Sequence, residues 1–263
     1  MTVLDVDGLT KTYRSHAADV EAIRDLTFQI GRGELVCIVG PSGAGKTTLL
    51  RCVAGLLDAT GGRIRLDGAE VTGPPAGMAV VFQEYGRSLF PWLTVGRNVE
   101  LPLKEKGLSR ADRAAKVEAA LAAVGLSDSA DAHPWQLSGG MQQRVAIARA
   151  VAYEPSVLLM DEPFAAVDAQ TRADLEDLVR TLWKQLGITV LFVTHDIDES
   201  VYLGQRVLVL SNRPTVILAD VPIDLPDERQ QLETRSSAQF TALRSRVYSL
   251  VQQAKKGHRP GTG

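Results

Sequence analysis

The sequence predicts an α/β fold with a mostly parallel sheet, a small antiparallel β element near the N-terminus and an inserted helical segment. Short, nearly continuous apolar runs in the second half of the chain suit strands that are buried on both faces of a parallel sheet. Apolar runs separated by turn residues fill the first 40 residues, and an alanine-rich, charged pattern at residues 110–124 is typical of a helix. The buried runs are residues 157–160, 189–193 and 207–210.

The first part of the chain favours strands at residues 3–9, 23–30 and 35–39. A Gly-Arg-Gly turn separates the second of these strands from the third. A further strand, at residues 63–66, lies between two glycine-containing turns. Short strands joined by such turns predict the antiparallel β element.

Helical patterns recur in the rest of the chain. A second helix of the insert follows Ser138 and runs through Arg149, and residues 172–186 form a crossover helix between two strands of the parallel sheet. Another helix is expected at residues 238–253. The predicted domains are a core of residues 1–84 and 156–225, a helical subdomain of residues 85–155, and a C-terminal helix with a polar tail at residues 226–263.

Composition limits the partners that the chain can bind. The net charge of −2 over 263 residues gives no electrostatic footprint for nucleic acid, so we expect no nucleic-acid partner. Basic residues at 255–259 are interpreted as a solvated tail, and Cys37 and Cys52 as small buried hydrophobes. No apolar stretch approaches the roughly 18 residues of a membrane span, and the N-terminus has no leader pattern, so we expect a cytosolic chain.

Residues 40–47 read Gly-Pro-Ser-Gly-Ala-Gly-Lys-Thr and fit the phosphate-loop pattern GxxxxGK[ST]. Backbone N–H groups between Ser42 and Thr47 can surround a phosphate, and the N-terminus of the following helix adds partial positive charge. We expect Lys46 to bridge the β- and γ-phosphates of a nucleoside triphosphate and the Thr47 hydroxyl to bind Mg²⁺. The predicted nucleotide-binding residues are Gly40, Pro41, Ser42, Gly43, Ala44, Gly45, Lys46, Thr47 and Thr48.

Two acids, Asp161 and Glu162, end the apolar run at residues 157–160. Beside a phosphate loop, the first acid is placed to hold Mg²⁺ and the second to act as the base that polarises the attacking water. In isolation, the same pair would instead be read as a cap of the following turn.

Ser138, Gly139 and Gly140 open a predicted helix and form a second possible anion site. One nucleotide has only one γ-phosphate for two such sites. We therefore expect Ser138 and Gly140 of one copy to meet the nucleotide held by Lys46 of another copy, with the two copies head to tail. Alone, Ser-Gly-Gly would more often be a loop or a helix cap.

Together these segments resemble the ATP-binding cassette (ABC) ATPases, whose motifs occur here in the same order over about residues 3–220. In that family residues 40–47 are the Walker A motif, residues 137–142 the signature, and Asp161 with Glu162 the Walker B acids. The resemblance implies a RecA-like P-loop NTPase core, ATP and Mg²⁺ as ligands, and ATP hydrolysis.

The resemblance also assigns roles to isolated residues. Tyr13 matches the aromatic residue that stacks on adenine, and Gln83 matches the Q-loop glutamine that reaches Mg²⁺ and the water. Residues 165–168 look like the D-loop, so Asp168 is expected among the nucleotide-binding residues, although Val167 stands where leucine is commoner. His195 matches the switch histidine that contacts the γ-phosphate, so it joins Glu162 and Lys46 in the expected catalytic set.

Residues 83–99 are similar to the nitrate, sulfonate and taurine importer branch, in which the membrane permease presses a short helix into this region. Leu89, Phe90 and Trp92 are either part of the subdomain core or a docking surface for that permease. The resemblance implies an importer ATPase for a small anionic solute, located at the cytoplasmic face of the membrane and served indirectly by a solute-binding protein.

Three other functions share some of these motifs. An exporter or lipoprotein-extraction ATPase would share every catalytic motif, and only the docking segment argues against it. A non-transport ABC ATPase would be expected to carry paired cassettes, a long coiled coil or a basic surface, which the sequence does not indicate. A free-standing kinase would leave Ser138–Gly140 without a purpose.

Overall fold

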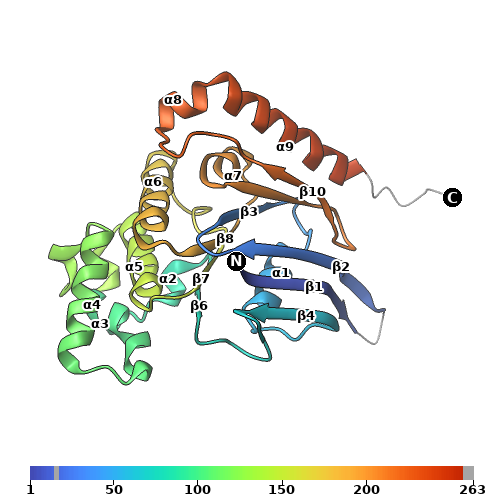
Figure 1. Ribbon diagram of the computed structural model, residues 1–263. Helices are drawn as coiled ribbons and strands as arrows, with labels where there is room; N and C mark the ends of the chain where they lie inside the picture. The colour runs from blue at the N-terminus through green and yellow to red at the C-terminus, as the bar shows by residue number, and fades with distance from the viewer. Residues whose placement is uncertain (15–17, 257–263) are drawn as a thin grey trace.

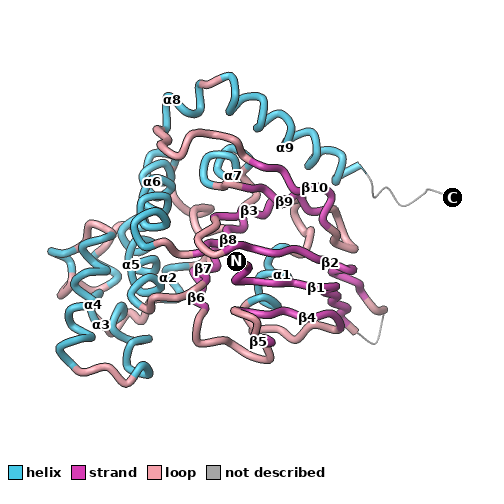
Figure 2. The backbone as a smooth tube through the Cα atoms, viewed as in Figure 1, coloured by secondary structure: helices cyan, strands magenta, loops and turns pink. Residues whose placement is uncertain are grey.

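The structure is a computed structural model that describes residues 1–14 and 18–256 of the chain (Figure 1). The predicted basic tail extends to His258 and Arg259, which lie outside the described residues, as does the end of the 226–263 segment. Two β-sheets lie at the centre of the described part. Helices flank them, and the helical insert projects on one side (Figure 2).

The larger sheet has six strands in the order β10-β9-β3-β8-β7-β6. All neighbouring pairs are parallel except β10–β9, which is antiparallel at the edge. Its apolar strands are buried on both faces, as a parallel sheet in an α/β fold requires. The strands are β3 (Leu35–Val39), β6 (Met78–Val81), β7 (Val157–Asp161), β8 (Thr189–Val193), β9 (Arg206–Leu210) and β10 (Ile217–Pro222).

The smaller sheet is antiparallel, with the order β2-β1-β4-β5. It contains β1 (Thr2–Tyr13), β2 (Val20–Gly31), β4 (Gly61–Leu66) and β5 (Ala69–Glu70). The predicted α/β fold with a mostly parallel sheet and an N-terminal antiparallel element is therefore confirmed.

Nine α-helices and three short 3₁₀ helices occur in the described residues. The helices are α1 (Lys46–Val53), α2 (Tyr85–Ser88), α3 (Val95–Glu100), α4 (Arg110–Ala123), α5 (Gly139–Ala152), α6 (Ala169–Leu186), α7 (Ile197–Leu203), α8 (Gln231–Ser236) and α9 (Ala238–Lys256). The 3₁₀ helices are Leu101–Lys106, Ser127–Ser129 and Pro134–Gln136. None of the helices in this part is long and apolar enough to cross a bilayer.

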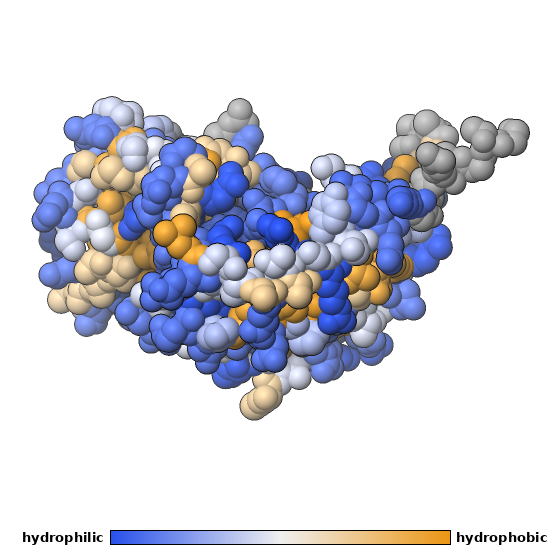
Figure 3. Space-filling view, turned by 90° about the horizontal axis from the view of Figure 1, so that it is seen from above, coloured by the Kyte–Doolittle hydropathy of each residue, from blue (hydrophilic) through white to orange (hydrophobic). Residues whose placement is uncertain are grey.

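The core has two halves, one on each face of the larger sheet. Along β3 the side chains alternate, so Val36 and Ile38 pack with α1 and the antiparallel sheet, whereas Leu35 and Cys37 pack with α5, α6, α7 and α9. Hydrophilic residues cover most of the surface seen in Figure 3. The carboxyl ends of the parallel strands meet at one edge, where ligands bind in sheets of this type.

Three strands were not predicted from the sequence, and one of them, β5, is only two residues long. β10 contains Asp220 and Pro222, which weaken a strand pattern but suit an exposed sheet edge. β6 is only four residues long, too short for a periodic signal to stand out. The predicted division at residues 84–85 and 155–156 stays a prediction.

Candidate nucleotide-binding site

The phosphate loop connects the carboxyl end of β3 to the first residue of α1. Gly45, the residue before the helix, has φ 76° and ψ 14°, a left-handed conformation that glycine adopts at little cost. At Gly40 a Cβ would lie 3.1 Å from the Cβ of Leu210 and 3.2 Å from its carbonyl oxygen. The Thr215 hydroxyl, buried behind the loop, donates to the Ala44 carbonyl. The loop is thereby held against β9 and the turn that follows it.

Lys46 points into this loop and is only 6% exposed. Its Nζ donates to the carbonyl oxygens of Gly40 and Pro41, at 3.2 Å and 3.3 Å, and lies 3.6 Å from Glu162 Oε1. The ammonium group therefore lies between the loop and the base predicted from the sequence, where it can meet a phosphate oxygen.

The groups predicted to hold Mg²⁺ line one pocket of about 700 Å³. Thr47 Oγ1 donates to Asp161 Oδ1 at 3.4 Å, and Gln83 borders the same pocket. Burial raises the pKa of Asp161, against the hydrogen bond from Thr47. A hydroxyl, a carboxylate and an amide oxygen are hard donors that fit Mg²⁺, which binds few protein ligands and keeps several waters.

The described residues contain no cluster of three or more His, Cys, Asp or Glu that could form a dedicated metal cage. In proteins, Mg²⁺ commonly binds one or two carboxylates together with substrate phosphates and water.

Glu162 and His195 form a hydrogen-bonded pair over the phosphate loop. His195 Nδ1 lies 2.8 Å from Glu162 Oε2, and Glu162 has φ 44°, which is rare for a residue with a side chain. Such strained positions cluster at functional sites. Both residues line a second pocket, of about 360 Å³, together with Ser42 to Thr48 and Arg213.

Arg213 was missed by the sequence analysis. It follows β9, the strand next to β3, and belongs to the turn that Thr215 fastens to the phosphate loop. No motif marks it. The signal that points to it is topological, because the turns after parallel strands converge at one edge of the sheet.

Tyr13 is at the last position of β1 and is 42% exposed. Its hydroxyl lies 3.1 Å from Thr48 Oγ1 in the first turn of α1. The ring therefore stands beside the phosphate loop, where an adenine base could contact its exposed surface.

Ser138, Gly139 and Gly140 lie elsewhere, at the N-terminus of α5. Ser138 Oγ accepts from the Met141 N–H at 3.3 Å, and the three residues border neither of the two pockets around the phosphate loop. Asp168 also lies outside both pockets and caps α6, and hydrogen bonds from Thr171 lower its pKa. Within one chain the structure does not bring these residues to the nucleotide site.

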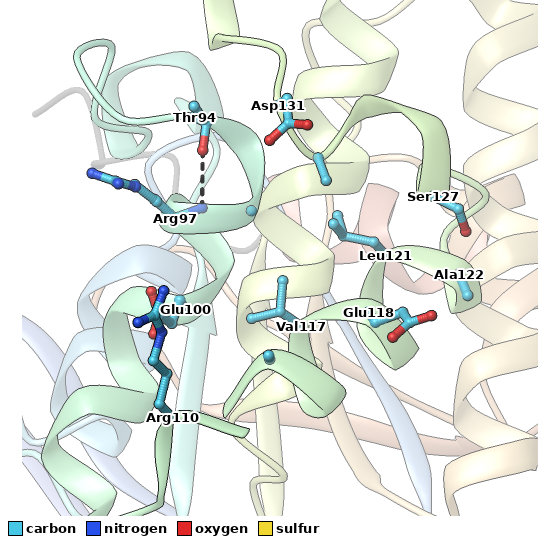
Figure 4. Close-up of a pocket in the computed structure, with 13 residues that line it drawn as sticks. Thr94, Arg97, Glu100, Arg110, Val117, Glu118, Leu121, Ala122, Ser127 and Asp131 are labelled. Atoms are coloured by element: carbon cyan, nitrogen blue, oxygen red, sulfur yellow. Dashed lines mark hydrogen bonds between the residues drawn. The ribbon is translucent and has the colours of Figure 1, made fainter. Parts of the chain in front are cut away.

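A third pocket, of about 590 Å³, lies on the helical insert (Figure 4). Arg97 of α3 borders it on one side, and Val117 and Leu121 of α4 on the other. It contains none of the predicted nucleotide-binding residues.

Comparisons with known proteins identify the family. The chain matches the ABC transporter family over residues 23–165. It is 45% identical to a nitrate import ATP-binding protein of Synechocystis sp., over 89% of this chain and 87% of that protein. An aliphatic sulfonates import ATP-binding protein of Bacillus cereus is 39% identical, over 98% and 97%.

Among solved structures, the chain resembles an ATP-binding cassette in a dimeric post-hydrolysis state bound to ADP and Pi. The TM-score is 0.74 at 33% identity, over 85% of this chain and all of that one. With a phosphate loop, two adjacent acids and a histidine around two pockets that share Thr47, this chain belongs to the ABC transporter family as one of its ATP-hydrolysing cassettes.

Proposed function

We propose that this chain is the ATPase subunit of an importer for a small anionic solute of the nitrate, sulfonate or taurine type. Its similarity to import ATP-binding proteins over nearly their whole length carries the proposal. In this assignment the chain acts at the cytoplasmic face of the membrane. It binds the permease directly, and a solute-binding protein delivers the solute to that permease.

The site residues are assigned by their positions. Lys46 and the phosphate loop bind the phosphates, Thr47, Asp161 and Gln83 hold Mg²⁺, and Glu162 activates water with His195 beside it. Tyr13 and Thr48 lie on the side where the nucleoside would sit.

The second half of the site comes from another copy of the chain in this proposal. Ser138 and Gly140 remain outside the chain's own nucleotide pockets, and similar cassettes form dimers. ATP then binds the closed dimer better than the open one. About 5.5 kcal/mol of differential binding would move such an equilibrium from mostly open to mostly closed, and two ATP molecules share that task.

A preformed surface after Gln83 supports the permease contact. Leu89 is buried, whereas Phe90 is 36% and Trp92 70% exposed, with their rings edge to face at 5.3 Å. Buried Asn98 holds the turn behind them. Its side chain accepts from the Phe90 N–H at 2.8 Å and donates to the carbonyl oxygens of Phe90, Leu93 and Thr94 at 3.0 to 3.2 Å.

Ser88, at the end of α2, is hydrogen-bonded to the signature helix α5. Arg149 of α5 donates to the Ser88 carbonyl at 2.6 Å and to its hydroxyl at 2.9 Å. A permease pressing on Phe90 and Trp92 would therefore act on a segment that is bonded to α5 and whose Ser88 lines the same pocket as Gln83. An exporter or lipoprotein-extraction ATPase remains the alternative function, and a non-transport ATPase is disfavoured because the relatives are named for import.

The test replaces the exposed ring. A Trp92→Ala variant is expected to hydrolyse ATP at the normal rate as an isolated chain. In cells that lack the native gene, it is expected to lower uptake of labelled nitrate, taurine or alkanesulfonate about tenfold or more, because hot-spot aromatic residues dominate protein interfaces. Tyr248→Ala, which removes another exposed ring on α9, is the matched control. Unchanged uptake with Trp92→Ala contradicts the docking role, and wild-type uptake of none of these solutes contradicts the proposed solute class.

A further inference from the structure

Thr171, in the first turn of α6, touches the signature helix of its own chain. A Cβ built on Gly140 would lie 2.4 Å from Thr171 Cγ2, and 3.8 Å from both Thr171 Cβ and Oγ1. A carbon–carbon separation of 2.4 Å is far inside van der Waals contact. Gly140 is therefore required here by a neighbouring methyl group, independently of any nucleotide. Figure 1 shows α5 and α6 side by side.

The Thr171 methyl cannot easily swing away. Its hydroxyl donates to Asp168 Oδ2 at 2.7 Å, and its backbone N–H donates to Asp168 Oδ1 at 3.0 Å. β-branched side chains have few χ1 options, and rotation about χ1 would break the hydroxyl bond. The cap at Asp168 thus fixes the rotamer that places the methyl over Gly140.

The same turn is linked to the segment that follows β8. Arg172 Nη1 lies 3.3 Å from Asp196 Oδ2, in the residue after His195. Adjacent residues of α6 therefore contact the signature on one side and the histidine segment on the other.

We propose that Thr171 is a positioning residue: its methyl group determines where the start of α5, Ser138–Gly140, lies relative to Asp168. The inference rests on the proposed function, in which Ser138 and Gly140 complete the nucleotide site of a second copy. Thr171 touches no nucleotide in this assignment. It determines where the N–H groups of α5 stand when the two copies close.

The test is a double-mutant cycle on the full chain. Gly140→Ala is expected to lower kcat for ATP hydrolysis about tenfold or more, because an added methyl in a packed contact forces the helices apart. Thr171→Ser removes Cγ2 but keeps the hydroxyl bond to Asp168. It is expected to cost about two- to threefold alone and to bring Gly140→Ala back to within about threefold of the wild type, as residues in direct contact are coupled.

Two readouts separate positioning from general stability. The affinity of the monomer for ATP should stay within error in all variants, and each variant should remain folded at the assay temperature even where overpacking lowers its unfolding temperature. Against that background, kcat and ATP-dependent dimer formation should change and recover together. The control is Thr181→Ser, an exposed threonine on the same helix whose hydroxyl bonds Asp177 O, and it should not rescue Gly140→Ala.

A Gly140→Ala variant with normal kcat overturns the inference, and so does a loss that Thr171→Ser leaves unrepaired, since the glycine would then be needed only for the partner's phosphate. Failure of the wild-type chain itself to hydrolyse ATP or to dimerise with it would instead contradict the proposed function.

Discussion

The molecule has two glycine-rich helix starts that look alike in sequence and differ in their surroundings. The start of α1 lies in a pocket together with Glu162, His195 and Arg213. The start of α5 carries the Ser138 cap on an open surface, apart from the pockets around the phosphate loop. Both offer free N–H groups and a helix dipole to an anion.

The difference shows that local chemistry does not decide the task of a helix start. The first is enclosed by the chain's own acids and histidine, so it has the groups needed to bind a nucleotide and activate water. The second has only backbone donors and a hydroxyl. Because it can add contacts to a phosphate that something else holds, its task in the proposed function depends on closure of the dimer.

The largest expected effect comes from a substitution near the start of α1 that keeps ATP binding but prevents ATP hydrolysis. A Glu162→Gln variant should keep ATP binding and lower phosphate release about 10²- to 10⁴-fold, the usual contribution of a general base. Because the γ-phosphate is then retained, both helix starts stay engaged and a dimer persists with Mg-ATP. Light scattering after size exclusion measures that dimer.

Glu118→Gln, which neutralises an exposed acid on α4, serves as the control for lost charge. Near-normal turnover by Glu162→Gln would exclude Glu162 as the base. A variant that binds ATP and remains monomeric would break the comparison itself, since the second start would have no nucleotide to meet.

The next largest effect is expected from substituting one residue at each helix start, Ser138 at α5 and Lys46 at α1. Ser138→Ala should lower kcat about ten- to a hundredfold, the worth of a hydrogen bond to a charged group, without changing the ATP affinity of the monomer. Lys46→Ala should weaken that affinity itself. Labelled-nucleotide titrations at low protein concentration, together with phosphate release, distinguish the two.

Loss of the helix cap must be separated from loss of the phosphate contact. Ser109→Ala removes a cap of the same kind, at the start of α4, in which Ser109 Oγ accepts from the Asp112 N–H at 3.1 Å. Ser109→Ala should lower the free energy of unfolding by about 1 kcal/mol and leave kcat unchanged. Equal kcat losses in Ser138→Ala and Ser109→Ala would show that Ser138 acts only as a helix cap. Unchanged ATP affinity in Lys46→Ala would argue against the assignment of residues 40–47 as the phosphate loop.

The first helix start was predictable from sequence because its residues are contiguous and each has a mechanical reason. The buried strands were predictable for a similar reason, since apolar runs identify themselves locally. Arg213 and Thr171 act through contacts between distant segments and carry no local pattern. Leu89 and Trp92 could not be told apart either, because a loop has no periodicity to separate a buried apolar side chain from an exposed one.

The smallest effect concerns α7, the helix that follows His195, which carries a buried acid. Glu199 of α7 is 3% exposed, and burial raises its pKa to about 8, against a hydrogen bond from Thr194 and with Glu176 and Asp196 raising it further. Arg172 opposes the shift. The folded protein therefore keeps a proton that the unfolded chain, with an ordinary value of 4.5, releases.

Stability consequently falls as the pH rises from about 4.5 towards 8, because the folded state binds the additional proton in that window. Between pH 6 and pH 8 this group should remove about 2 kcal/mol from the free energy of unfolding. Glu199→Gln should abolish that part of the decline, while Glu233→Gln, an exposed acid on α8, should leave it in place. Urea unfolding at both pH values measures it. An equal decline in wild type and Glu199→Gln would show that Glu199 is ionised in the folded protein. The first turn of α7, the helix that follows His195, would then contain a buried, ionised carboxylate.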